Sequence, residues 1–422
     1  MKKERTVTLR DKNGKIFYGW VIVFMCLLNT TFVYATGISC AGTFMLPVTE
    51  SLGFGMGEFG LYITIMSFAG LGALLVLQNK MTEKNLKRIM IISGILTGIS
   101  FLGFAFSTEI WQFYLLSIPM GIGFMCMTIT PSEILVANWF GSKARAFALS
   151  IATLGPSVGA LLLINVLNQI VYKIGWNYGY IAIAIGIICI AVPATMILYV
   201  WSPEQKNTER MGVDTENTVE VNQSGMTFRE AAKGPKVWIF LFSATIITLA
   251  SSSFLTQAQS ALIVEGYSPT IAAALISLAS GLLFIGSVVV GRSIDKWGVR
   301  IIAPLVVMIY VCAFLSMMLA SYGVLLVILS IIAYGFGANS VLLVPPWVMT
   351  HMFGERYVGQ FFAWLSACTC LGGSFGATVA GTIFDTTGSY TYVWLGMALI
   401  MFVGGIIRGW CSTSKNAYKE TE

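Results

Sequence analysis

Residues 121–141 read GIGFMCMTITPSEILVANWFG, and residues 335–354 read GFGANSVLLVPPWVMTHMFG. Each stretch opens with two glycines one residue apart and reaches a proline ten residues after the first glycine, at Pro131 and at Pro345. This matched spacing is difficult to obtain by chance in apolar sequence. It indicates an internal repeat, so the two halves of the chain are predicted to share one architecture.

The composition around these stretches is that of a membrane protein. Hydrophobic residues make up 56% of the 422 residues and charged residues 10%, against about 25% charged in soluble domains. A run of about 20 apolar residues crosses a bilayer as a helix. Twelve such runs occur, near 17–46, 57–78, 88–106, 111–138, 146–170, 177–201, 237–264, 269–291, 300–320, 322–350, 357–384 and 389–411.

The charged residues predict the orientation of these spans. All 25 Lys and Arg residues except Lys173 fall on the side of the N-terminus. Cytoplasmic loops carry such an excess, so both termini are predicted to be cytoplasmic in a multi-pass protein of the cell (inner) membrane. The net charge of +6 is thereby assigned to topology, and no nucleic-acid partner is expected. The opposite side holds Glu50, Glu58, Glu109, Glu265 and Asp385.

The predicted fold is an all-α integral membrane protein of twelve transmembrane helices in two pseudo-symmetric six-helix bundles. The N-terminal bundle covers 1–201, a polar cytoplasmic linker covers 202–236, and the C-terminal bundle covers 237–422. The first apolar run is too long for a signal peptide and is predicted to be a retained span. One histidine and no C-x-x-C pair predict no metal and no cofactor. An enzyme is not expected, because the sequence shows no catalytic set.

Residues 291–300, GRSIDKWGVR, follow the eighth run. They resemble the cytoplasmic motif of the major facilitator superfamily, in which Gly, Asp and basic residues alternate. The resemblance implies that Asp295, with Arg292 and Arg300, latches two helices on the cytoplasmic side by pairing with an Arg. The equivalent turn after the second run, residues 79–84, lacks the Gly and the Asp. The latch is therefore expected only in the second half.

Three further features resemble the monocarboxylate-transporter and oxalate/formate-exchanger branch of that superfamily. They are residues 18–21, YGWV; residues 138–141, NWFG, followed by Arg145; and residues 381–390, GTIFDTTGSY. The resemblance covers essentially the whole chain and implies a carrier whose halves rock about a central site. Arg145 is assigned to the gating motifs on the same basis.

The chain departs from this branch at three cation positions. Where related carriers place Lys or Arg in spans one, eight and eleven, this sequence has Ile38, Ser287 and Leu365. An unpaired anion within the membrane costs several kcal/mol. A dianion is therefore a poor candidate, and the substrate is expected to be a neutral or apolar organic metabolite or an organic monoanion.

Polar, aromatic and thioether groups on the spans expected to line the cavity are the substrate-binding candidates. Each also has an ordinary role in helix packing or in bonding the preceding turn. Glu133 is the candidate for proton coupling, with a structural pairing to Lys143 or Arg145 as the alternative. The substrate-binding candidates are Tyr34, Ser39, Met127, Thr153, Gln257, Gln259, Ser287, Asn339 and Trp364.

The predicted function is secondary active transport by alternating access. The partners are a small-molecule substrate, the lipid bilayer and protons or a counter-substrate, and the carrier is expected to be monomeric. Two alternatives stay open: a drug or metabolite efflux carrier, and a solute sensor that uses the same fold without transporting.

Overall fold

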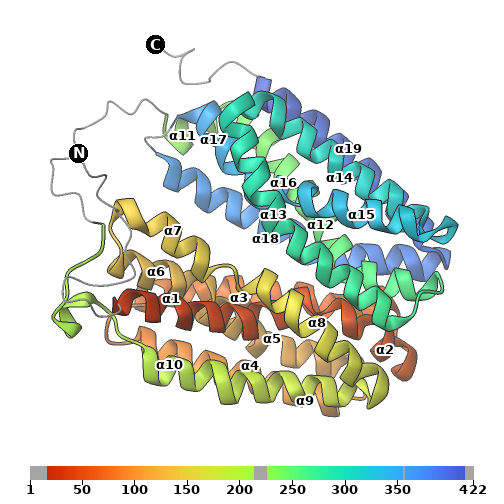
Figure 1. Cartoon of the computed structure of the whole chain (residues 1–422), viewed down its shortest axis with the longest axis horizontal. Coiled ribbons are helices and arrows are strands. Elements are labelled where there is room, and N and C mark those ends of the chain that lie inside the picture. The colour runs from red at the N-terminus through yellow and green to blue at the C-terminus, as the bar shows by residue number, and fades with distance from the viewer. Residues whose placement is uncertain (1–16, 213–225, 355–356, 414–422) are drawn as a thin grey trace. The chain divides into compact units, whose positions relative to one another are not determined.

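The computed structural model describes residues 17–212, 226–354 and 357–413. Within them, twelve helical stretches are long and apolar enough to cross a membrane, which confirms the predicted number (Figure 1). The spans run Tyr18–Ser39, Met56–Leu77, Leu86–Phe106, Ile110–Trp139, Phe147–Lys173, Trp176–Leu198, Pro235–Val264, Pro269–Trp297, Val299–Met318, Val324–Phe353, Gln360–Thr387 and Tyr390–Thr413.

The chain divides into two compact units. Unit 1 contains the described residues of Met1–Ala41 and Ile65–Val219, and unit 2 those of Gly42–Thr64 and Glu220–Glu422. Residues 42–64, which include the start of the second span at Met56, therefore group with the second half of the chain. The bundle boundaries at 201 and 237 stay predictions.

Unit 1 is built from helices that are repeatedly interrupted. In lipid the backbone must satisfy its own hydrogen bonds, so apolar runs form helices. Two spans contain π-helical stretches, η1 and η3, and a third breaks at Thr128. The elements are α1 (Tyr18–Asn29), η1 (Thr30–Ser39), η2 (Gln78–Lys80), α4 (Leu86–Phe106), α5 (Ile110–Met127), α6 (Ile129–Trp139), α7 (Ser142–Ala152), α8 (Gly155–Lys173), α9 (Trp176–Gly186), η3 (Ile187–Ala191), α10 (Val192–Leu198) and η4 (Pro203–Lys206).

Unit 2 consists of longer helices and includes the docked segment 42–64. Helix α3 (Met56–Leu77) begins in this unit and continues into unit 1. The other elements are α2 (Gly42–Leu52), α11 (Phe228–Ala231), α12 (Pro235–Val264), α13 (Pro269–Trp297), α14 (Val299–Met318), η5 (Ala320–Tyr322), α15 (Val324–Gly337), α16 (Asn339–Leu342), α17 (Val344–Phe353), α18 (Val358–Thr387) and α19 (Tyr390–Thr413).

The repeated glycines hold equivalent places in the two units. A Cβ at Gly121 would overlap the Met66 carbonyl of α3, and a Cβ at Gly335 would overlap Leu282 of α13. The first glycine of each pair thus meets the second span of its own half. Because glycine has no side chain, the two backbones can approach closely there.

The second glycine of each pair meets the third span of its half. A Cβ at Gly123 would overlap Thr97 of α4, and one at Gly337 would lie against Tyr310 of α14. The sequence repeat therefore corresponds to a repeated packing arrangement, which explains why both glycines recur.

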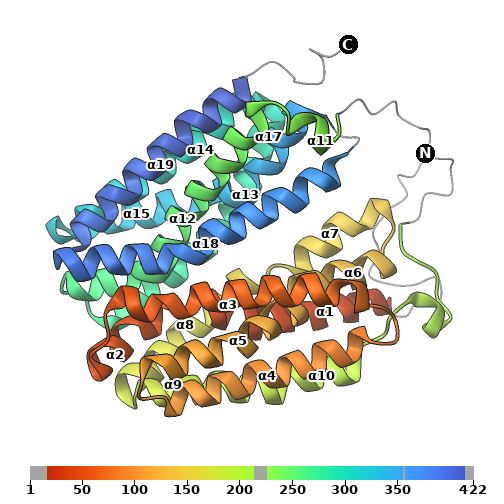
Figure 2. The ribbon, with the colours of Figure 1, turned by 180° about the vertical axis from the view of Figure 1, so that it is seen from behind.

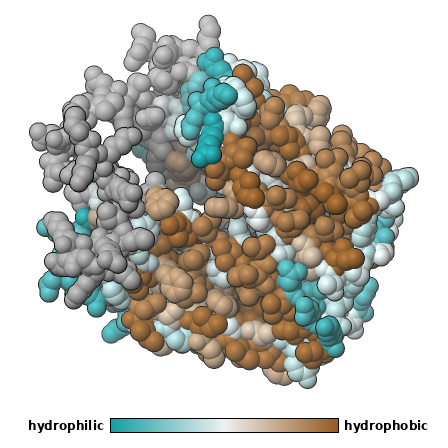
Figure 3. All heavy atoms as spheres, in the orientation of Figure 1, coloured by the Kyte–Doolittle hydropathy of each residue, from teal (hydrophilic) through white to brown (hydrophobic). Residues whose placement is uncertain are grey.

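The outer surface of the helices is strongly apolar. Large side chains such as Leu75, Phe106 and Ile197 are mostly exposed. In the view of Figure 3, hydrophobic residues cover most of the visible helical surface, with hydrophilic residues near helix ends. Within unit 2, α14 and α19 lie side by side in both Figure 1 and Figure 2. Such a surface requires lipid as its solvent.

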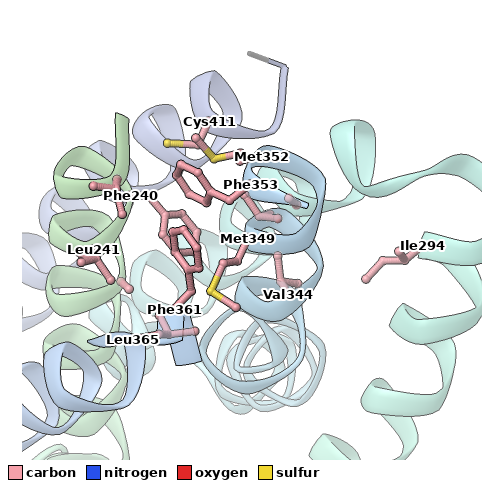
Figure 4. Close-up of a cluster of buried hydrophobic side chains, with 14 of the residues drawn as sticks. Phe240, Leu241, Ile294, Val344, Met349, Met352, Phe353, Phe361, Leu365 and Cys411 are labelled. Carbon is pink, nitrogen blue, oxygen red and sulfur yellow. The ribbon is translucent and has the colours of Figure 1, made fainter. Parts of the chain in front are cut away.

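A buried apolar cluster joins the ends of the unit 2 helices that the charge distribution assigns to the cytoplasm (Figure 4). The rings of Phe353 and Phe361 stack with centroids 4.7 Å apart. Leu365, one of the three positions that lack the expected cation, belongs to this cluster and is 6% exposed.

Candidate transport site

The first span changes from α- to π-helix in its middle. The π-helical stretch η1 covers Thr30–Ser39 and contains two predicted binding residues, Tyr34 and Ser39. Tyr34 is half-buried with its ring 4.6 Å from Phe124 of α5, while Ser39 is 7% exposed. Departures from α-helical geometry within a span are frequent at functional sites, so this ten-residue stretch is the candidate region in unit 1.

A second helix break packs directly against this stretch. The chain leaves α7 at Thr153 and re-enters a helix at Gly155, where a Cβ would overlap Thr30. The Thr30 hydroxyl also donates to the Ala152 carbonyl at 3.0 Å. Thr153, a predicted binding residue, donates to the Leu149 carbonyl of its own helix at 2.9 Å. The structure thus brings the break that contains Thr153 to η1.

The thioether of Met127 and the polar pair of Asn29 and Thr195 are buried and make their contacts inside unit 1. Met127 is fully buried at the end of α5, and its sulfur faces Gly94 of α4. Asn29 and Thr195 form a fully buried reciprocal pair, in which the amide donates at 3.0 Å and the hydroxyl at 3.2 Å. Buried polar groups are normally satisfied in this way.

In unit 2, Gln257 lies in a satisfied network. It is fully buried, its amide nitrogen donates to the Ala377 carbonyl at 3.3 Å, and its oxygen accepts from the Tyr390 hydroxyl at 3.1 Å. Gln259, two residues on, accepts from the Thr43 hydroxyl at 2.9 Å. The two amides therefore serve different neighbours, one within the C-terminal helices and one on the docked segment.

Asn339 and Ser287 lie on adjacent helices. Asn339 is 2% exposed at the break between α15 and α16, where its amide donates to the Gly335 carbonyl at 3.1 Å. A Cβ on Gly286 of α13 would lie 3.0 Å from that amide. The next residue, Ser287, donates to the Phe284 carbonyl at 2.7 Å. The close approach of Gly286 to Asn339 thus brings the helix that carries Ser287 against the break that carries Asn339.

Residues 381–390 have a clear structural role in unit 2. The Asp385 carboxylate accepts from the backbone amides of Met56 and Gly57, each at 2.8 Å. Gly388 ends α18 with φ +67°, a left-handed conformation that favours glycine. Phe384 stacks on Tyr390 with ring centroids 4.3 Å apart. The motif therefore ends one helix, caps another and anchors a third.

Trp364 is part of a contact with the linker. The Phe228 ring of α11 stacks on it with centroids 5.0 Å apart and planes 7° apart, and Trp238 meets it edge-on at 6.2 Å. The Phe228 amide also donates to the Gln360 side chain at 3.1 Å. We call Phe228, Trp238 and Trp364 the linker clamp.

A capping box holds α11 in place for this contact. The Thr227 hydroxyl accepts from the Glu230 amide, and the Glu230 carboxylate accepts from the Thr227 amide at 2.8 Å. The hydrogen bond from the Thr227 backbone holds the pKa of Glu230 below its usual range. This lowered pKa keeps Glu230 ionised at neutral pH, so its carboxylate acts as an acceptor in the capping box.

The charged candidates are mostly exposed in the described residues. Arg145, Arg292 and Asp295 are all exposed. Arg300 donates to the His351 ring at 3.3 Å. Glu133 is exposed on α6, and its role stays a prediction.

One buried cation was missed by the sequence analysis, which counted it as cytoplasmic. Arg408 of α19 is fully buried, and among the described residues none forms a hydrogen bond with its guanidinium. The guanidinium lies 5.2 Å from the centroid of the Phe240 ring. A single Arg near the end of an apolar run gave no signal that it would be buried. The docking contacts of residues 42–64 were also missed, because sequence periodicity carries no information on partners far apart in the chain.

A comparison with protein-family models assigns the chain. The model described as Major Facilitator Superfamily matches residues 27–350. The chain belongs to the Major Facilitator Superfamily. This membership confirms the resemblance seen in residues 291–300, and members of this superfamily are membrane transporters and not enzymes.

Two distant relatives lie within this superfamily of transporters. Monocarboxylate transporter 3 of Gallus gallus is 24% identical over 165 residues, which cover 39% of this chain and 30% of the relative. The uncharacterized transporter ESBP6 of Saccharomyces cerevisiae is 23% identical over 307 residues, 70% of this chain and 44% of the relative. The chain thus spans less than half the length of either relative.

Solved superfamily structures share the fold. The nucleoside transporter NupG superposes with a TM-score of 0.72 at 13% identity, covering 94% of this chain and all of that one. A D-xylose-proton symporter gives a TM-score of 0.71 at 14% identity, with 95% and 99% covered. At such identities the similarity shows the architecture alone, and the twelve-helix transporter fold is confirmed.

Proposed function

We propose that this superfamily member is a secondary active transporter that carries a small organic solute across the cytoplasmic membrane by alternating access. The family assignment supports transport of a solute. The partial similarity to monocarboxylate transporter 3 supports a carboxylate-bearing or related organic substrate. The interrupted helices of unit 1 support a site near the middle of the spans, since broken helices line the binding sites of many carriers.

The proposed substrate is an organic monoanion or a neutral, largely apolar metabolite. The single observation that carries this proposal is the absence of cations at Ile38, Ser287 and Leu365. Leu365 is packed in the apolar cluster, and the hydroxyl of Ser287 is bonded to its own helix. Helix ends and amides contribute about 0.3–2 kcal/mol each, too little to offset the desolvation of two carboxylates.

Arg408 does not replace these cations in the proposal. It is the only charged side chain among the described residues that is buried, and it packs over Phe240 at the end of α19. Its place next to the apolar cluster favours a structural role. The proposed binding residues with polar groups at or beside helix breaks are Tyr34, Ser39, Thr153, Ser287 and Asn339. The side chains of the other candidates already contact neighbouring protein groups; these are Met127, Gln257, Gln259 and Trp364.

Coupling to protons is proposed through Glu133, the carboxylate on α6. Exchange for a counter-substrate is the other mode of coupling that fits the same fold.

Reconstitution in proteoliposomes tests the proposed function. Uptake would be measured for monocarboxylates, aromatic acids, amino-acid derivatives and steroids, with and without an imposed proton gradient. Saturable accumulation of a monoanion or neutral solute is expected, and protein-free liposomes serve as the control. Specific binding without accumulation for every solute would instead show a sensor.

A further inference from the structure

Two motifs that the sequence analysis singled out, YGWV and NWFG, meet at the end of unit 1 that the charge distribution assigns to the cytoplasm. The rings of Tyr18 and Trp139 lie 5.6 Å apart. The Tyr18 hydroxyl donates to the Leu198 carbonyl at 3.1 Å, and the Lys206 ammonium lies 4.8 Å from the centroid of the Tyr18 ring. The first motif therefore contacts both the end of the sixth span and the segment that follows it.

The NWFG motif holds the same segment with two side chains. The Trp139 indole donates to the Val200 carbonyl at 3.0 Å, and the Asn138 amide donates to the Trp201 carbonyl at 3.4 Å. Trp139 is fully buried, and a buried indole N–H requires an acceptor. Its acceptor here lies on the chain just past the sixth span, at the entry to the linker.

The linker then returns to NWFG and pairs with its backbone. The Met211 amide donates to the Trp139 carbonyl at 3.2 Å, and the Met211 carbonyl accepts from the Gly141 amide at 2.8 Å. These bonds form a parallel β-bridge. The next residue, Gly212, has φ +76°, and a Cβ there would lie 2.8 Å from the Ala144 side chain. Glycine therefore suits this position twice, for the left-handed backbone and for the close contact with α7.

Unit 2 holds the other end of the linker by a contact of the same kind. The Met226 amide donates to the Phe353 carbonyl at 3.2 Å. Phe353 and Gly354 repeat Phe140 and Gly141, although the carbonyl that accepts lies one residue later in the repeat. Helix α11 follows at once, and α11 and α17 lie side by side in both views (Figures 1 and 2). Each half thus binds one end of the linker at the same turn.

The pairing at Met211 also bears on the start of α7. Gly141 directly precedes α7, and its carbonyl accepts from the amides of Ala144 at 3.1 Å and of Arg145 at 2.9 Å. The first residues of a helix depend on the residue before it for their orientation. Since Gly141 has no side chain with which to hold itself, its own orientation depends on backbone contacts such as the bond to Met211.

We propose that the turn at the end of the fourth span, and its repeat at the end of the tenth, are docking surfaces for the two ends of the linker. The docked segment of Met211 and Gly212 positions Arg145 at the start of α7. Each docking contact lies within its own unit. The part of the proposal that concerns Arg145 rests on the proposed transport function, because that residue is assigned to gating, while the docking does not.

Thiol labelling tests the docking without any substrate. In a variant with all eight native cysteines replaced, Ala144→Cys and Ala231→Cys place reporters at side chains that are 0% and 6% exposed. Ala231 belongs to the apolar cluster against which Met226 packs. In purified protein, Met211→Pro removes the amide that binds Trp139. It should raise the labelling of position 144 by maleimide about two- to twelvefold, the range for loss of one hydrogen bond, and leave position 231 unchanged.

Two controls make the result specific to the backbone pairing. Met211→Ala keeps the amide and should leave position 144 shielded. Met226→Pro should expose position 231 and not position 144. Unchanged labelling of position 144 in Met211→Pro would overturn the docking, and exposure of both positions by either proline would overturn its confinement to one unit.

Transport kinetics test the positioning of Arg145. Met211→Pro and Arg145→Gln should each lower the maximal rate with little change in KM. The double variant should be no slower than the slower single variant, because both changes act on the same turn. Losses that multiply in the double variant would overturn the positioning of Arg145 while leaving transport and docking intact. If the parent protein moves no solute, the proposed function fails, and the labelling result still decides the docking.

Discussion

The carboxylate of Asp385 accepts a hydrogen bond from the backbone amide of Gly57 at 2.8 Å, across 328 positions of sequence. The neighbouring amide of Met56 binds the other oxygen at the same distance. The FDTTGSY stretch, residues 384–390, thereby connects the end of α18 to the start of α3. Its last residue, Tyr390, also donates a hydrogen bond to Gln257 of α12. A Cβ at Gly57 would overlap Thr382, so no larger residue fits at this position beside Asp385.

Topology gives the most elementary prediction. In a cysteine-free background, Glu204→Cys should be shielded from impermeant maleimide in intact cells, while Glu265→Cys should be labelled. Glu265 is preferred to its neighbour Gly266, which has φ +94° and would be strained by substitution. Permeabilised cells, in which both thiols should react, provide the control. Labelling of residue 204 from outside would reverse the predicted orientation.

The cytoplasmic latch predicts a separation of rate from affinity. Asp295→Asn should lower the maximal rate of transport and change KM little, because an exposed residue at the end of α13 acts on a conformational equilibrium rather than on the site. The neighbouring exposed residue Lys296, changed to Gln, is the matched control. A large rise in KM at an unchanged maximal rate would place Asp295 near the substrate instead.

The linker clamp predicts coupling between Phe228 and Trp364. Their stacked rings should contribute about 0.5–1.5 kcal/mol beyond simple burial. Phe228→Ala and Trp364→Ala should therefore lower the thermal midpoint by similar amounts, and the double variant should lower it by less than the sum. Purified protein in detergent suffices for this measurement.

The same pair of variants also tests the assignment of Trp364 to the substrate site. If Trp364 binds substrate, its replacement raises KM while Phe228→Ala does not. Equal transport kinetics in the two variants would restrict Trp364 to the clamp.

The architecture could be predicted from the sequence to a large extent. The twelve apolar runs predicted the twelve spans. The repeated Gly-x-Gly pairs predicted a shared architecture, and Gly121 and Gly335 each pack against the second span of their own half. The π-helical stretch at Thr30–Ser39 could not be predicted, because apolar periodicity does not distinguish helix types over so few residues.

The candidate site was less accessible to prediction than the fold. A buried amide such as Gln257 must find partners, but sequence does not say whether they are protein or ligand. The structure supplies Tyr390 and Ala377. Likewise, the burial of Arg408 depends on the helices packed around it, and its apolar neighbours Ile406 and Ile407 are typical of any span end.

Substrate charge tests the central claim most directly. Proteoliposomes loaded with unlabelled solute would be assayed for counterflow of labelled oxalate and of labelled monocarboxylates, for the native protein and for Ser287→Arg. We predict negligible oxalate exchange by the native protein, and about tenfold tighter binding of small carboxylates by the variant, a gain of about 1.4 kcal/mol. Robust oxalate exchange by the native protein would contradict the account, since it would require a cation that reaches the substrate.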